Sequence, residues 1–67
     1  MCQMKIILKQ ADSEEVVLEN ASILELTDKG VMVSAMFEQP KLIPGVQVSY
    51  IDFLNGRVTV TKRKGKV

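Results

Sequence analysis

The chain has 67 residues, of which 46% are hydrophobic and 25% are charged, and its formal net charge is +1. This balance is typical of a soluble globular protein, and not of a disordered segment or a strongly basic nucleic-acid binder. The single cysteine excludes an internal disulfide, and no apolar run approaches the roughly 20 residues that a membrane-spanning helix needs. We therefore expect one cytoplasmic domain, whose small core a dimer interface would supplement.

Short apolar runs alternate with turn signals along the whole chain. They predict six strands, at residues 4–9, 15–18, 22–26, 31–37, 46–54 and 57–61. Successive side chains of a strand point to opposite faces, so Cys2 shares the face of Ile6 and lies at the rim of the core. The first two strands should pair as a hairpin across the polar residues 11–14. The strand at 31–37 has apolar residues on both faces, which suits a closed barrel or a subunit interface.

Glycines and prolines mark the later turns. Gly30 can supply the positive φ that a tight turn requires. Pro44 and Gly45 fit the two central positions of a type II turn, within the longest expected loop at residues 38–45. Asn55 followed by Gly56 is the strongest local hairpin signal in the chain. These signals separate strands and leave no room for a helix.

No stretch of ten residues shows helical periodicity. Closely spaced strands in a chain of this length predict an all-β domain, a small SH3-like barrel of five to six strands over residues 1–61. Closing the sheet would also remove exposed strand edges. Residues 62–67 form a basic C-terminal tail, which we expect to act as a solubilising terminus. The two phenylalanines and the tyrosine are expected in the core, with the methionines as gap-filling residues.

Most catalytic chemistry is missing from this composition. Histidine is absent, which removes the commonest general base and the commonest metal ligand. No glycine-rich phosphate loop occurs, since each of the four glycines stands at a turn or in the tail. The clustered carboxylates Asp12, Glu14 and Glu15 are interpreted as a solvated turn. We do not expect an enzyme.

Cys2 stands out because of its position. A lone cysteine is most often a small buried hydrophobe. At position 2, however, the thiolate, the backbone amide of Cys2 and the amine of Met1 can close five-membered chelate rings around one metal ion. A soft thiolate with nitrogen donors in a plane suits Ni(II) or Cu(II), whereas zinc prefers a tetrahedral set.

A square-planar ion needs four donors, and one chain end offers at most three. Two chains related by a twofold axis could each supply an amine and a thiolate. If Met1 is removed, the amine belongs to Cys2. If Met1 is retained, the donors are the Met1 amine, the Cys2 amide nitrogen and the Cys2 thiolate, with a fourth from elsewhere. The sequence leaves both arrangements open.

Four parts of the chain carry a family resemblance: residues 1–8, residues 18–21, Phe37 and residues 50–58. Through them the chain resembles, over its full length, the CooT family of small nickel-binding proteins. The resemblance implies an SH3-like barrel, a homodimer, and Ni(II) held at the dimer interface through Cys2. It also implies a role as metallochaperone or nickel reservoir, with a nickel enzyme such as carbon monoxide dehydrogenase, or its maturation factors, as partner.

An alternative function is a small RNA-binding module. Its basis is the basic tail from Lys62 to Lys66, with Tyr50 and Phe53 as stacking groups. A net charge of +1 gives little driving force from counterion release, so nucleic acid is not the expected partner.

Overall fold

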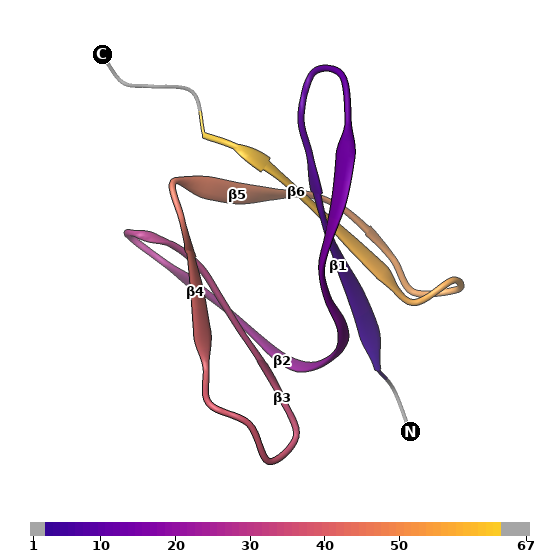
Figure 1. Ribbon diagram of the computed structural model, residues 1–67, viewed down its shortest axis with the longest axis vertical. Helices are drawn as coiled ribbons and strands as arrows, with labels where there is room; N and C mark the ends of the chain where they lie inside the picture. The colour runs from indigo at the N-terminus through magenta and orange to yellow at the C-terminus, as the bar shows by residue number, and fades with distance from the viewer. Residues whose placement is uncertain (1–2, 64–67) are drawn as a thin grey trace.

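The computed structural model describes residues 3–63, and this part of the chain forms six strands and no helix (Figure 1). The strands are β1 (Met4–Lys9), β2 (Glu14–Thr27), β3 (Gly30–Ala35), β4 (Lys41–Pro44), β5 (Val46–Asp52) and β6 (Arg57–Lys62). They form one sheet in the order β4-β3-β2-β1-β6-β5. The predicted all-β class and the predicted number of strands are confirmed. No helix long and apolar enough to span a membrane occurs between residues 3 and 63.

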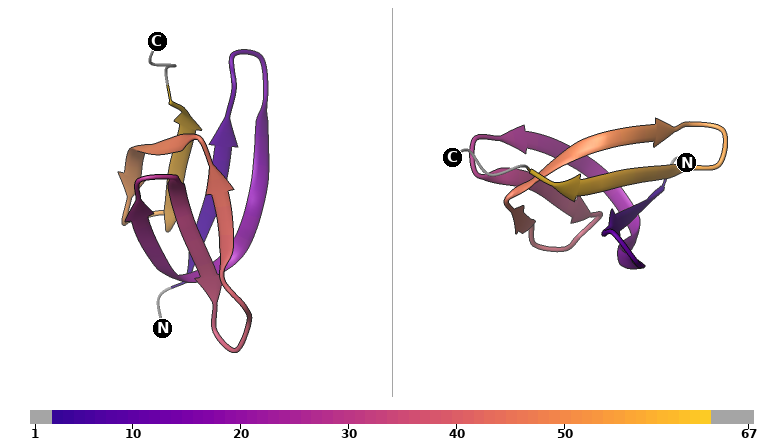
Figure 2. Two further views of the ribbon diagram at one scale, coloured as in Figure 1. Left: turned by 90° about the vertical axis from the view of Figure 1, so that its left-hand side faces the viewer. Right: turned by 90° about the horizontal axis from the view of Figure 1, so that it is seen from above.

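The first and last strands, β1 and β6, lie side by side in the middle of the sheet. β1 pairs with β6 in parallel, and all other neighbouring strands pair antiparallel. The sheet curls so that β5 approaches β3 (Figure 2). It is nevertheless not closed, because the outer strands β4 and β5 do not pair with each other. A single residue, Gly45, joins these two strands, which is too short a connection to let one fold back along the other. The SH3-like barrel therefore stays a prediction.

The core lies inside this curl. All six strands contribute buried apolar residues to it: Ile6, Ala21, Val31, Val33, Ile43, Val46, Val58 and Val60. Met4 and Leu8 pack against this cluster, so the predicted inward face of β1 is confirmed. β-Branched residues dominate the core because they fit the pleated surface of a sheet.

Two strand assignments from the sequence were wrong. The runs at 15–18 and 22–26 belong to one bent strand of 14 residues, β2, which pairs with β1 in its first part and with β3 in its second. A register shift between Ala21 and Ile23 lets the strand bend without ending. The expected loop at 38–45 contains the short edge strand β4, which begins directly after Pro40 and ends with Pro44. Proline is tolerated at such an edge because its missing N–H would face away from the sheet.

The three aromatic residues were expected in the core, and the structure contradicts this. Phe37 is 98% exposed, Phe53 is 83% exposed and Tyr50 is 60% exposed. Phe37 follows the end of β3 and adopts φ of 66°, a left-handed conformation that is unusual for a bulky residue. This backbone turn carries its ring away from the strand, so the alternation of β3 ends at Ala35.

Candidate functional site

Cys2 and Met1, the predicted metal ligands, lie outside the described residues. The described chain begins at Gln3, and its path into β1 is fixed by the turn between β5 and β6. The Lys5 backbone N–H donates to the Gly56 carbonyl oxygen at 2.7 Å, and Lys5 pairs with Arg57 in the parallel ladder. A Cβ atom on Gly56 would lie 3.3 Å from the Gln3 carbonyl oxygen, so the turn and the start of β1 are in close contact.

This turn is built on an aspartate. The Asp52 carboxylate accepts the Asn55 backbone N–H at 3.1 Å on one oxygen and the Asn55 side-chain amide at 2.8 Å on the other. These hydrogen bonds, the side-chain one foremost, hold the pKa of Asp52 below its ordinary value, and the positive charge of Arg57 adds to the effect. The sequence predicted a two-residue Asn55–Gly56 hairpin. The structure instead has a four-residue connection, because β5 ends at Asp52.

The longer connection exposes two apolar side chains. Phe53 and Leu54 occupy its first two positions, and Leu54 is 92% exposed. Sequence reasoning missed this feature because it assigned both residues to the preceding strand. The signal that could have found it is the Asp-x-x-Asn spacing, since an aspartate commonly bonds the backbone and side chains of the residues just after it and so starts a turn.

An open hollow of about 540 Å³ lies beside the start of β1. Its lining comes from the first strand, the bend of the second and the β5–β6 turn: Gln3, Met4, Ser22, Phe53, Leu54, Asn55 and Gly56. A smaller apolar pocket shares Met4 and Ser22 with it and continues to Ile23. The two hollows therefore form one continuous surface next to the residue that follows Cys2.

Metal-ligating side chains do not cluster elsewhere in the described part of the chain. Between residues 3 and 63, no three carboxylates lie close enough together to hold an ion. Met4, the thioether nearest Cys2 in sequence, is half-buried against the core, in line with a gap-filling role.

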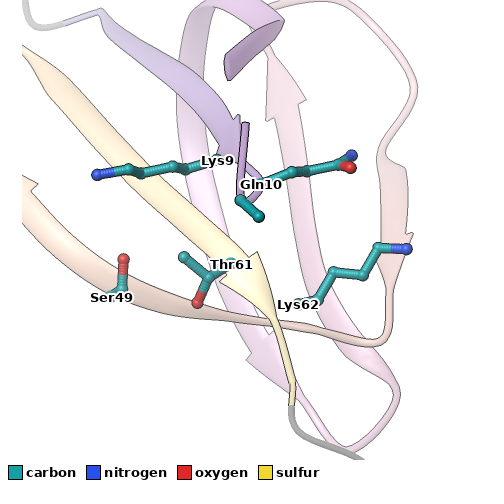
Figure 3. A pocket seen from close by; sticks show the side chains of 6 residues that line it. Lys9, Gln10, Ser49, Thr61 and Lys62 are labelled. Atoms are coloured by element: carbon teal, nitrogen blue, oxygen red, sulfur yellow. The ribbon is translucent and has the colours of Figure 1, made fainter. Parts of the chain in front are cut away.

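A second hollow, of about 600 Å³, is lined mainly by residues with polar side chains and lies where β1 and β6 end (Figure 3). Lys9, Gln10, Ser49, Thr61 and Lys62 line it together with Ala11. The Lys9 and Lys62 ammonium groups point toward opposite sides in Figure 3, so they do not converge on one anion.

The residues suggested for RNA binding are dispersed. Tyr50 and Phe53 are exposed, yet Tyr50 lies within β5 and Phe53 in the turn beyond its end. Arg63 is engaged by the protein itself, because its guanidinium donates to the Asp28 carbonyl at 3.1 Å and to the Val46 carbonyl at 3.5 Å. Lys62 is the last residue of β6, and residues 64–67 lie outside the described part.

Comparison with known proteins gives a family and a fold. Among curated proteins, no sequence matches the chain. A crystal structure assigned to CooT from Carboxydothermus hydrogenoformans superposes with a TM-score of 0.82 at 22% identity, covering 94% of this chain and all of the other. At this identity the likeness shows a shared fold. The family model for CooT, described as a CO dehydrogenase accessory protein, matches residues 1–61. The chain therefore belongs to the CooT family of CO dehydrogenase accessory proteins.

Proposed function

We propose that this protein binds Ni(II) between two chains through the Cys2 thiolate of each, with nitrogen donors from Met1 or Cys2 completing the plane. It acts as a metallochaperone or nickel reservoir in the cytoplasm and serves the maturation of a nickel enzyme. CO dehydrogenase, for which the CooT family is an accessory protein, is an example of such an enzyme. The observation that carries the proposal is the lone thiol at position 2 of a chain that has no histidine.

The chemistry of these donors favours nickel. A cysteine thiolate is soft and strongly electron-donating, and an adjacent amine or amide nitrogen closes a five-membered ring with it. Two such pairs give the flat four-coordinate set that Ni(II) accepts readily. The half-set of one chain is incomplete, so the ion is held only while two chains are together, and separating them would release it.

The location of Gln3 supports a shared site. Gln3 is exposed and directly follows Cys2, while the backbone just after it is fixed to Gly56. This anchor fixes the direction in which the described chain enters β1. The exposure of Gln3 also leaves room for the corresponding residue of a second chain.

Titration with Ni(II), followed by absorbance in the thiolate-to-metal charge-transfer region, tests the proposal. We expect a new band that saturates at one ion per two chains. Native mass spectrometry of the same samples gives the number of chains, the number of ions and the presence or absence of Met1.

The matched control is Cys2→Ser, which keeps size and hydrogen bonding and removes the thiolate. We expect no band and no retained ion for this variant. Binding by Cys2→Ser equal to that of the unaltered protein, or an unaltered protein that leaves the spectrum unchanged, would overturn the proposal.

A further inference from the structure

The junction between β4 and β5 is a corner at which two ladders of the sheet meet. The Gly45 backbone N–H donates to the Lys29 carbonyl oxygen at 2.9 Å, which extends the β3–β4 ladder beyond its last pair. The Gly45 carbonyl oxygen accepts the Arg63 backbone N–H at 2.8 Å, which extends the β5–β6 ladder in the same way. Gly45 therefore belongs to both ladders. In Figure 1 this corner lies on the side of the molecule away from the start of β1.

The Arg63 side chain spans this corner. Its guanidinium donates to the Asp28 carbonyl oxygen at 3.1 Å and to the Val46 carbonyl oxygen at 3.5 Å. Asp28 lies in the turn between β2 and β3, 35 residues before Arg63, and Val46 begins β5. A guanidinium has several N–H donors in fixed directions, so one side chain can bond two carbonyls at once. Arg63 thus joins the end of β6 to the β2–β3 turn and to β5.

The β2–β3 turn presents the Asp28 carbonyl in a fixed position. The Thr27 hydroxyl oxygen accepts the backbone N–H of Lys29 at 3.2 Å and that of Gly30 at 3.1 Å. The same hydroxyl donates to the Gly30 carbonyl oxygen at 2.9 Å. Asp28 lies inside the turn that these hydrogen bonds close. An acceptor that is already held in place loses little conformational freedom when Arg63 bonds it.

Arg63 also lines a hollow of about 200 Å³ on the side of the curl where β3 approaches β5 without pairing with it. The lining residues come from β2, β3 and β5 and from the residue after β6: Leu26, Thr27, Gly30, Val31, Val46, Gln47, Val48 and Arg63. Val31 and Val46 belong to the core and are only 1% and 2% exposed. Because no ladder joins β3 to β5, contacts across the corner keep this side of the core closed.

We propose that Arg63 is a latch that holds the β2–β3 turn on the corner. In the closed state its guanidinium bonds Asp28 and Val46. In the open state the guanidinium is released, the turn moves away, the bond from the Gly45 N–H to the turn breaks, and the hollow widens toward the core. The family model for CooT matches residues 1–61, so the latch is supplied by a residue that follows the matched segment. The inference goes beyond the proposed function and does not depend on it.

Hydrogen exchange of the Gly45 amide, followed by NMR on the full chain, tests the latch. This amide exchanges only when its bond to Lys29 breaks, so its exchange rate reports the population of the open state. A hydrogen bond of ordinary net strength changes an equilibrium constant by roughly fivefold. We therefore expect exchange about fivefold faster in Arg63→Met, which keeps an apolar stem and removes the guanidinium.

Two controls separate the latch from a general loss of stability. The Lys5 amide, bonded to the Gly56 carbonyl oxygen at 2.7 Å near the start of β1, should keep its exchange rate in Arg63→Met. Lys62→Met removes the same charge one position earlier, from a side chain that lines the hollow at the ends of β1 and β6. It should leave exchange of the Gly45 amide unchanged. Arg63→Lys should exchange as fast as Arg63→Met, since an ammonium lacks the planar fork of donors.

The inference is wrong if the Gly45 amide is as protected in Arg63→Met as in the unaltered chain, or if the Gly45 and Lys5 amides accelerate equally. Full protection in Arg63→Lys would also overturn it, because charge alone would then suffice. If Arg63→Met does not fold, the unaltered chain decides. Two fixed hydrogen bonds hinder rotation of the guanidinium, so the protons of its two Nη atoms should give separate NMR signals at low temperature. A single averaged signal would show that the guanidinium is not held and would exclude the latch.

Discussion

Replacing Gly30 by alanine should destabilise the fold strongly although it adds one methyl group. Gly30 has φ of 151°, and a Cβ atom there would overlap the Ile43 carbonyl oxygen and lie 2.8 Å from the Pro44 Cα atom. Both neighbours are backbone atoms, so no side-chain rotation can relieve the overlap. β4 would have to move away from β3 at the point where Gly30 pairs with Pro44.

The magnitude follows from two contributions. Holding a non-glycine residue in such a conformation costs about 1–3 kcal/mol. Displacing β4 would also expose part of Ile43, a core residue whose full burial contributes about 1.5–3 kcal/mol. We therefore expect Gly30→Ala to lower the free energy of unfolding by about 3 kcal/mol. A domain of 67 residues has a total of only about 3–10 kcal/mol, so the variant should lose roughly a third or more of its stability.

Urea denaturation followed by far-ultraviolet circular dichroism measures this loss, and Gly45→Ala is the control. Gly45 also has a positive φ, 70°, but no described atom beyond its chain neighbours lies within 4 Å of the Cβ position. Its replacement should cost only the conformational strain of about 1–2 kcal/mol. Equal losses for the two variants would refute the reasoning, since they would mean that the backbone of β4 does not press on Gly30.

Three further predictions concern exposed groups. Phe37→Gly should raise the free energy of unfolding by about 1 kcal/mol, because it relieves a left-handed backbone without removing buried surface; a lower melting temperature would contradict this. Asp52→Ala should melt below the unaltered protein at pH 7. Because the pKa of Asp52 is lowered in the folded protein, its ionised carboxylate stabilises the fold at pH values above the ordinary carboxyl pKa. This stabilisation is lost as the pH falls through the pKa of the folded state. The difference in melting temperature between Asp52→Ala and the unaltered protein should therefore vanish in acid. A difference that persists at pH 2 would exclude this origin. Binding of single-stranded RNA should be weak, and deletion of residues 63–67 should not change it; steeply salt-dependent binding abolished by the deletion would instead support the RNA-binding alternative.

The parts of the fold that local patterns determine were predictable. β1 was assigned with its observed bounds, and its inward face follows from the alternation of side chains. Gly30 was recognised as a turn residue because few other residues adopt its backbone conformation. The parallel pairing of β1 with β6 was not predicted, since no local signal reports which distant strand will lie beside β1.

The errors have a common physical cause, which is that tertiary pairing decides where a strand continues. β2 continues through Asn20 and Ala21 because its first part pairs with β1 and its second part pairs with β3. This pairing keeps residues with poor strand propensity in the ladder. Phe53 and Leu54 read as strand because they are apolar, but the Asp52–Asn55 hydrogen bonds end the pairing before them. Of the candidate site, the sequence supplied the thiol at Cys2, while the apolar surface that Gln3 helps to line emerged only from the fold.

The parallel pairing of β1 with β6 brings two distant parts of the sequence together. Because the Lys5 N–H bonds the Gly56 carbonyl and the Gln3 carbonyl lies against Gly56, the residue that follows Cys2 is positioned by the β5–β6 turn. The same turn carries Phe53 and Leu54 at its tip. Under the proposed function, nickel affinity and association are then linked: the dimer supplies the geometry for the ion, and the ion in turn favours the dimer.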